Sequence, residues 1–288
     1  MKRILIVVLL LFVFAFSSFI SISDAQRRRR GRARRPAPAA ASGKITVPCP
    51  ATLNSITDCP DTGCGELDPL LNTQKNTTNG NPDNARDIQF TEFANLEESV
   101  PGYGGIGAPR KPLKDKGEGD MVRVVAWALD ARPQNTRDPN KRGESCNCGF
   151  TGVNDPENTD VHIVLVDDPT LKLKARAGNG KSAAVNTLKK REAESQTAEF
   201  TPRLRIARHE SFDGAKLKGL IDPANGGTLL VRVTGLLMYD SEHALGPFKL
   251  LRHTDWEIHP VFRLEFCPDN KTCAAGSDAN WKDLETSP

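Results

Sequence analysis

Residues 255–266 read Asp-Trp-Glu-Ile-His-Pro-Val-Phe-Arg-Leu-Glu-Phe and predict a long β-strand. Apolar and polar side chains alternate along it, so they fall on opposite faces of the strand. Glu257 and His259 are neighbours on the polar face. Pro260 follows them and cannot donate a hydrogen bond to a neighbouring strand, which indicates an edge or a bulge. Bulges often lie next to sites in β-barrels, so this strand is the first candidate for a functional surface.

Four other stretches carry alternating or continuous apolar residues and are also predicted to be strands. They are Met121–Ala131, Asp160–Asp167, Gln196–Ile206 and Thr228–Tyr239. A helix is predicted over His209–Ile221, where apolar residues recur at a helical spacing. Gly235 stands in the middle of the fourth strand and marks a bulge or a sharp bend.

Five strands, with a helix between the third and the fourth, predict a mainly β fold: a five-stranded OB-like Greek-key barrel over about residues 119–268. An immunoglobulin-like sandwich is the competing architecture, but it needs about seven strands and no core helix. The segments Asp160-Val-His-Ile, Phe200-Thr-Pro-Arg203 and Trp256-Glu-Ile-His-Pro-Val261 resemble those of exported bacterial proteins of unassigned function. The resemblance implies the barrel and carries no particular activity.

Residues 1–25 predict an export signal. Two basic residues precede an apolar run from Ile4 to Phe16, and the small residues Ser23 and Ala25 suit cleavage after Ala25. The run has 13 residues, fewer than the roughly 20 that a spanning helix needs. An uncleaved anchor is the alternative. We therefore expect a secreted or periplasmic protein with no transmembrane segment in its mature chain.

Residues 26–43 predict a disordered tail, because seven of the nine residues 27–35 are arginine and a Pro/Ala linker follows. Such a tail could bind an anionic membrane surface or another polyanion. Beyond residue 43 the chain holds 30 Lys+Arg against 35 Asp+Glu, a balance of −5. Residues 44–118 predict a loop-rich extension with a short helix over Thr91–Glu98, and residues 269–288 a C-terminal tail.

Seven cysteines in an exported chain favour disulfides. Cys267 and Cys273 are the pair that the sequence favours, because they close a short loop after the last strand. The three N-terminal cysteines are expected to staple the extension. The alternative is a zinc site, whose usual ligand spacings are not matched. Its candidate ligands are Cys59, Cys64, Cys146 and Cys148.

The first functional hypothesis is an OB-like binding protein for an extended anionic ligand, either nucleic acid or acidic polysaccharide. The segment between the second and third strands has no acidic residue between Thr170 and Arg191. An OB barrel binds oligomers across these two strands and nearby loops. A solvated loop is the alternative interpretation. The candidate ligand-binding residues are Lys172, Lys174, Arg176, Lys189, Lys190, Arg191, Arg203 and Arg205.

The second hypothesis is a metal-dependent hydrolase of the nuclease or phosphodiesterase type. No cofactor is firmly implied, but imidazoles and carboxylates can bind a divalent metal, and all five histidines fall in the predicted barrel. The alternative is that these groups satisfy backbone atoms at strand ends, with His259 bonded to Glu257. The candidate metal ligands are His162, His243, His259 and Asp160. The candidate catalytic residues are His259, Glu257 and Asp240.

Overall fold

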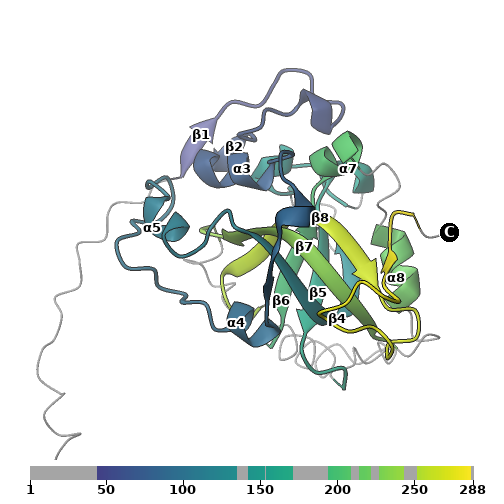
Figure 1. Ribbon diagram of the computed structural model, residues 1–288. Helices are drawn as coiled ribbons and strands as arrows, with labels where there is room; N and C mark the ends of the chain where they lie inside the picture. Colours follow the sequence, from purple (N-terminus) through teal and green to yellow (C-terminus); the bar gives the residue numbers. More distant parts are fainter. Residues whose placement is uncertain are drawn as a thin grey trace, which may run out of the picture. The chain divides into compact units, whose positions relative to one another are not determined.

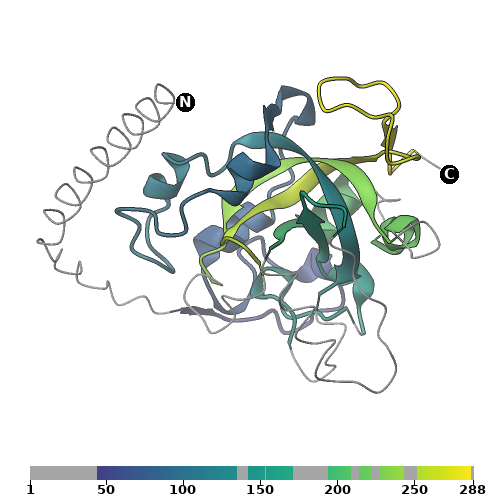
Figure 2. The same ribbon diagram turned by 90° about the horizontal axis from the view of Figure 1, so that it is seen from below.

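A computed structural model describes residues 44–134, 142–152, 154–170, 194–208, 214–221, 227–242 and 252–286. Within them the chain is mainly β, and five strands close into a barrel (Figures 1 and 2). The barrel order is β4-β5-β6-β8-β7, and β7 pairs back with β4. β6 and β8 are parallel, whereas the other barrel pairs are antiparallel. The five strands are β4 (Met121–Pro133), β5 (Val161–Val166), β6 (Gln196–Phe200), β7 (Leu229–Tyr239) and β8 (Trp256–Phe266).

Because the five strands close into a barrel, the competing immunoglobulin-like sandwich of two stacked sheets is excluded. One side of each strand is apolar and lines a shared core, as period-two alternation requires. Helix α8 (Gly214–Ile221) packs against β4 and buries Leu217 and Ile221 in that core. It covers the second part of the helix predicted over His209–Ile221, and residues 209–213 lie outside the described residues.

The predicted third strand, Gln196–Ile206, is too long. β6 ends at Phe200, and Pro202–Arg208 forms helix α7. The hydroxyl of Thr201 accepts a hydrogen bond from the backbone N–H of Leu204 at 3.2 Å and so caps this helix. Proline is favoured in the first turn of a helix, because its missing N–H would have no partner there. The Thr201-Pro202 pair therefore ends the strand.

The predicted bend at Gly235 is confirmed. The pairing of β7 with β8 shifts register on both sides of this residue. A Cβ atom at Gly235 would lie 2.4 Å from the carbonyl oxygen of Pro260. Only glycine allows the two strands to approach so closely.

The N-terminal extension has more structure than its composition indicates. Strand β3 adds in parallel to β4, and Phe93 of α4 is fully buried in the barrel core. Helix α4 spans Phe90–Ala94, where the sequence predicts Thr91–Glu98. Figure 1 shows β1, β2, α3 and α7 on one side of the barrel. The elements of the extension are β1 (Ile45–Val47), η1 (Ile56–Asp58), β2 (Gly65–Leu67), α3 (Pro69–Lys75), η2 (Pro82–Asn84), β3 (Arg86–Ile88), α4 and α5 (Lys111–Lys114).

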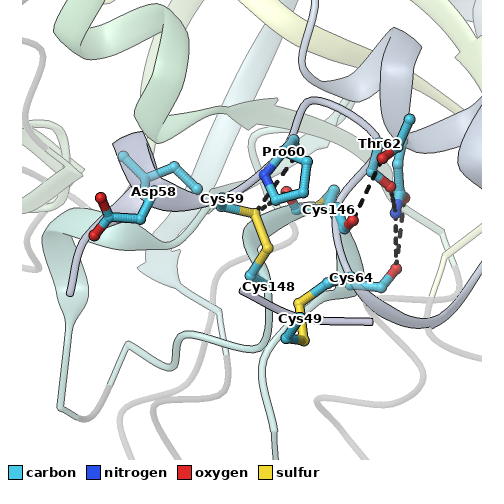
Figure 3. Close-up of a disulfide and its surroundings, with 12 residues drawn as sticks. Cys49, Asp58, Cys59, Pro60, Thr62, Cys64, Cys146 and Cys148 are labelled. Atoms are coloured by element: carbon cyan, nitrogen blue, oxygen red, sulfur yellow. Dashed lines mark hydrogen bonds between the residues drawn. A yellow bond between two sulfur atoms is a disulfide. The ribbon is translucent and has the colours of Figure 1, made fainter. Parts of the chain in front are cut away.

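Two disulfides clamp the extension. Cys49 joins Cys64 within it, and Cys59 joins Cys148 in the segment between β4 and β5 (Figure 3). That segment also holds the 3-10 helices η3 (Ser145–Asn147) and η4 (Pro156–Asn158). Because three of the four candidate zinc cysteines are oxidised, the zinc alternative for this set is wrong. Cys146 is a free, buried thiol.

The C-terminal segment is tied to the barrel. Cys267 and Cys273 form the disulfide that the sequence favours. Strand β9 (Lys282–Asp283) pairs with β8, and Leu284 after it is fully buried. Among the described residues, every helix is too short or too polar to cross a lipid bilayer.

Candidate metal centre

Three neighbouring strands direct polar side chains to the outer face of the barrel. His162 on β5 pairs with Glu199 on β6. The parallel pairing of β6 with β8 then brings Glu257 and His259 beside Glu199. The alternating side chains point into the core instead. They are Ile163, Ala198 and Ile258.

Glu199 is the point at which both histidines meet. Its Oε2 atom lies 3.5 Å from Nε2 of His162 and 3.2 Å from Nδ1 of His259. The glutamate is 2 % exposed, and the His259 side chain is completely buried. The two imidazoles therefore converge on one shared oxygen, as a common ligand site requires.

Two more carboxylates complete the cluster. Oδ2 of Asp160, the residue before β5, lies 3.8 Å from Nε2 of His259. Oε1 of Glu144 lies 3.5 Å from Nε2 of His162. Gln134, just after β4, holds Glu144 through two hydrogen bonds of 2.6 and 3.1 Å.

The N-terminal extension covers this outer face of the barrel. The carboxylate of Asp68 caps α3 by accepting hydrogen bonds from the N–H groups of Leu70 and Leu71, and Pro69 starts the helix. The helix ends at Lys75, whose buried ammonium lies 3.3 Å from Glu144 and 3.7 Å from Glu257. The cluster therefore closes only when extension and barrel are folded together.

Basic side chains behind the cluster form ion pairs with Glu257. Arg252 donates hydrogen bonds to Glu257 and, at 2.9 Å, to Asp240. Burial alone would raise the pKa of Glu257, but Arg252 and Lys75 lower it to about 2. Glu257 is thus a fixed anion, and it accepts a 3.1 Å hydrogen bond from Nδ1 of His259. This bond orients the ring and turns Nε2 toward Asp160.

Four buried atoms of the cluster have no hydrogen-bond partner within the described residues. Buried polar atoms are normally paired, because an unpaired one keeps its full desolvation cost. The four atoms belong to neighbouring side chains, and Oε2 of Glu199 lies 3.5 Å from Nε2 of His162. The four atoms are Oδ1 of Asp160, Nε2 of His162, Oε2 of Glu199 and Nε2 of His259.

Side chains of the same cluster also have shifted pKa values. Burial, and then Glu144 and Glu199, raise the pKa of Asp160 to about 7. Burial opposes protonation of His259, but the nearby carboxylates, Glu199 first, raise its pKa to about 10. Burial also raises the pKa of the Cys146 thiol. Each of these pKa shifts favours the form that reduces negative charge, which indicates that a cation would stabilise the cluster.

Three of the five imidazole–carboxylate separations in the cluster are longer than hydrogen bonds, and the other two, of 3.1 and 3.2 Å, are within hydrogen-bond range. Hydrogen bonds to imidazole nitrogen are about 2.7–3.2 Å long, whereas three of the imidazole–carboxylate separations are 3.5, 3.5 and 3.8 Å. Two ligand atoms that are each about 2.1 Å from one ion lie roughly 3–4 Å apart. A ligating histidine usually donates its other ring N–H to a carboxylate, which orients the ring. Glu257 occupies this position beside His259.

The structure brings together most of the residues predicted for the metal site. Asp160 and His259 fall in one candidate ligand set and His162 in a neighbouring one, while His243 lies outside the described residues. Glu257 and Asp240 are both buried against Arg252 and Lys75. Both belong to an ion-pair network, and the catalytic role predicted for them stays a prediction.

The residues predicted to bind a polyanion are mostly not described. Of the described two, Arg203 donates hydrogen bonds to Asp61 and to the Cys59 carbonyl, and Arg205 to the Glu157 carbonyl. Both lie on α7, not on a third strand, and they hold the extension and η4. The others fall outside the described residues: Lys172, Lys174, Arg176, Lys189, Lys190 and Arg191.

Sequence reasoning missed Glu199, Glu144, Lys75 and Arg252. Glu199 gave one usable signal, since it is a charged residue between Ala198 and Phe200 in a predicted strand. The remaining three come from helix ends and connections, whose distance from the strands is set only by the tertiary fold. No family model, curated protein or solved structure matches the chain.

Proposed function

We propose that this protein is an exported OB-like barrel protein that binds a divalent metal ion between β5, β6 and β8. The observation that carries the proposal is that the buried residues Asp160, Glu199 and His259 each offer a ligand atom within 4.8 Å of the other two. Each of these side chains also carries a buried atom with no hydrogen-bond partner among the described residues. One ion at the centre of the three ligand atoms would offset their charge.

The strand arrangement supports an OB-like barrel. The second and third barrel strands, β5 and β6, are neighbours, and the fifth strand, β8, lies between the third and the fourth. This order supports the Greek-key connectivity that we propose for the closed five-stranded barrel. OB barrels bind ligands on the face of their second and third strands, which is the face that carries His162 and Glu199. The disulfides support export, because they persist in oxidising compartments.

The donor set suits a transition metal. Imidazole nitrogen favours zinc, copper, iron or nickel, and carboxylate oxygen also suits manganese. Mg²⁺ and Ca²⁺ prefer sites made of oxygen alone. We therefore expect Zn²⁺ or Mn²⁺ to bind in preference to Mg²⁺.

A metal-dependent hydrolase is the second candidate. The observation that favours it is that the His162 side chain is 23 % exposed at the edge of an otherwise buried cluster, with its Nε2 atom buried. A water molecule bound to the ion on that side could be activated as a nucleophile. The candidate reaction is hydrolysis of a phosphodiester, tested with bis-p-nitrophenyl phosphate and metal-loaded protein against the metal-free protein.

Metal content tests the main proposal directly. The chain is purified in its oxidised form, stripped with a chelator, and titrated with Zn²⁺ or Mn²⁺ in a calorimeter. Binding that also raises the melting temperature is expected, since a ligand at 100 times its Kd stabilises the folded state by about 2.7 kcal/mol. Asp160→Asn should weaken binding, and the exposed-histidine control His253→Ala should not. Absence of binding by the unmodified chain would refute the proposal.

A further inference from the structure

Two candidate ligand sets, not one, occupy the outer face of the barrel. Asp160, Glu199 and His259 form the inner set, and Glu144, His162 and Glu199 form the outer set. In each set the ligand atoms all lie within 4.8 Å of one another. Glu199 belongs to both. We infer that the centre holds two divalent metal ions bridged by the carboxylate of Glu199, an inference that rests on the proposed function.

The strand order separates the two histidines. His162 is on β5 and His259 on β8, and β6 with Glu199 lies between them. Neighbouring strands are about 4.8 Å apart, so the histidine backbones are separated by roughly twice that distance. Each ring approaches Glu199 from its own side. One ion can therefore take one histidine in each half of the site, with Glu199 between the ions.

Each half has its own further ligand and its own support. In the inner half, Asp160 faces Nε2 of His259, and Glu257 and Glu199 lie 3.1 and 3.2 Å from the opposite ring nitrogen. In the outer half, Glu144 faces His162, and Gln134 fixes the Glu144 carboxylate. The two halves are joined a second time through Cys146, whose sulfur lies 3.2 Å from Glu144 and 3.6 Å from Asp160.

Charge also favours cations at this centre. Five carboxylates meet here, and among the described residues Lys75 and Arg252 lie in ion-pair contact with them. Burying an excess of negative charge is costly, so cations bound among these carboxylates would stabilise the cluster. The carboxylates are Glu144, Asp160, Glu199, Asp240 and Glu257.

Stoichiometry tests this inference separately from the proposed function. The metal-free oxidised chain is loaded with excess Mn²⁺ or Zn²⁺, freed of unbound ion, and analysed for metal and protein content. Two ions per chain are expected. His162→Ala should keep one ion, because it removes a ligand of the outer half only, and His253→Ala should keep two. One ion per chain in the unmodified protein would overturn the inference and leave the proposed function intact, whereas none would overturn both.

A spectroscopic measurement on the unmodified chain avoids dependence on a variant that folds poorly. Two Mn²⁺ ions held about 3.5–4 Å apart, as in two-metal sites, should give an exchange-coupled electron paramagnetic resonance spectrum. His162→Ala should convert it into the spectrum of an isolated ion. An isolated-ion spectrum from the fully loaded unmodified chain would contradict the bridge.

Discussion

Nδ1 of His259 lies 3.1 Å from Oε1 of Glu257 and 3.2 Å from Oε2 of Glu199, so both carboxylates hold this ring nitrogen. Glu257 is held as an anion by Arg252 and Lys75, so it accepts the Nδ1 proton. Nε2 is then the atom left for a ligand. The candidate ligand His259 and the residue that orients it, Glu257, are thus two residues apart on the outer face of β8.

Glu257→Gln should lower metal affinity by about 10- to 100-fold, the usual effect of losing an orienting carboxylate behind a ligating histidine. The measurement is calorimetric titration with Zn²⁺, with Glu66→Gln on the exposed surface of β2 as the control. Stability of the metal-free variant is measured in parallel. A loss of stability with unchanged metal affinity would show that Glu257 acts only in folding.

The metal-free protein should lose stability as the pH rises from about 4 to above 7. The pKa of Asp160 is raised from 3.8 to about 7 in the folded protein, so the folded state binds this proton more tightly than the unfolded state. The stabilisation is complete below the unfolded pKa and disappears as the pH passes the folded one. Asp160→Asn should flatten this part of the profile in urea titrations, and the exposed Asp167→Asn should not. A profile unchanged by Asp160→Asn would contradict the assignment.

Removing the Cys59–Cys148 disulfide should destabilise the protein more than removing Cys267–Cys273. The first bridge spans 89 residues and the second 6. On loop entropy alone the losses are roughly 4–5 and 2 kcal/mol. Paired Cys→Ala variants are compared by urea unfolding. Only the first pair should also weaken metal binding, because it anchors the segment that carries Glu144. Equal metal affinity in both double variants would refute this coupling.

Gly235→Ala should destabilise the barrel by about 1–3 kcal/mol, the usual cost of overpacking. The added methyl group would meet the Pro260 carbonyl at 2.4 Å and the Ile258 side chain at 2.6 Å. Gly219→Ala in α8 is the matched control, since its Cβ would meet nothing within 4 Å, and alanine favours a helix by up to about 1 kcal/mol. Urea unfolding of both variants measures the difference. Equal stability of the two would contradict the close approach of β7 and β8.

Binding of a polyanion through the basic segment stays a prediction. If Lys189, Lys190 and Arg191 contact phosphates or sulfates, affinity for single-stranded DNA or heparin should fall steeply as salt rises. The triple Ala variant should bind more weakly and show a shallower salt dependence. A truncation of the Arg-rich tail separates its contribution. Binding that is independent of salt, or unchanged in the triple variant, would refute the hypothesis.

The sequence predicts the strands well because period-two alternation is local. β4, β5, β7 and β8 fall within the predicted ranges or within two residues of them. It places Asp160 with His162, and Glu257 with His259, for the same reason. It cannot predict that Glu199 lies between the two pairs, since that depends on the parallel pairing of β6 with β8. Lys75 and Glu144 are further removed still, because loops and disulfides bring them in.

The cysteine pattern has a consequence for how the protein matures. Cys146 and Cys148 are two residues apart, and the sulfur of Cys59 lies 3.6 Å from the Cys146 carbonyl while bonded to Cys148. During oxidation both thiols therefore compete for the same partner. A bridge to Cys146 instead would consume the thiol that lies beside Glu144 and Asp160, so the choice between these two cysteines decides whether a free thiol remains there.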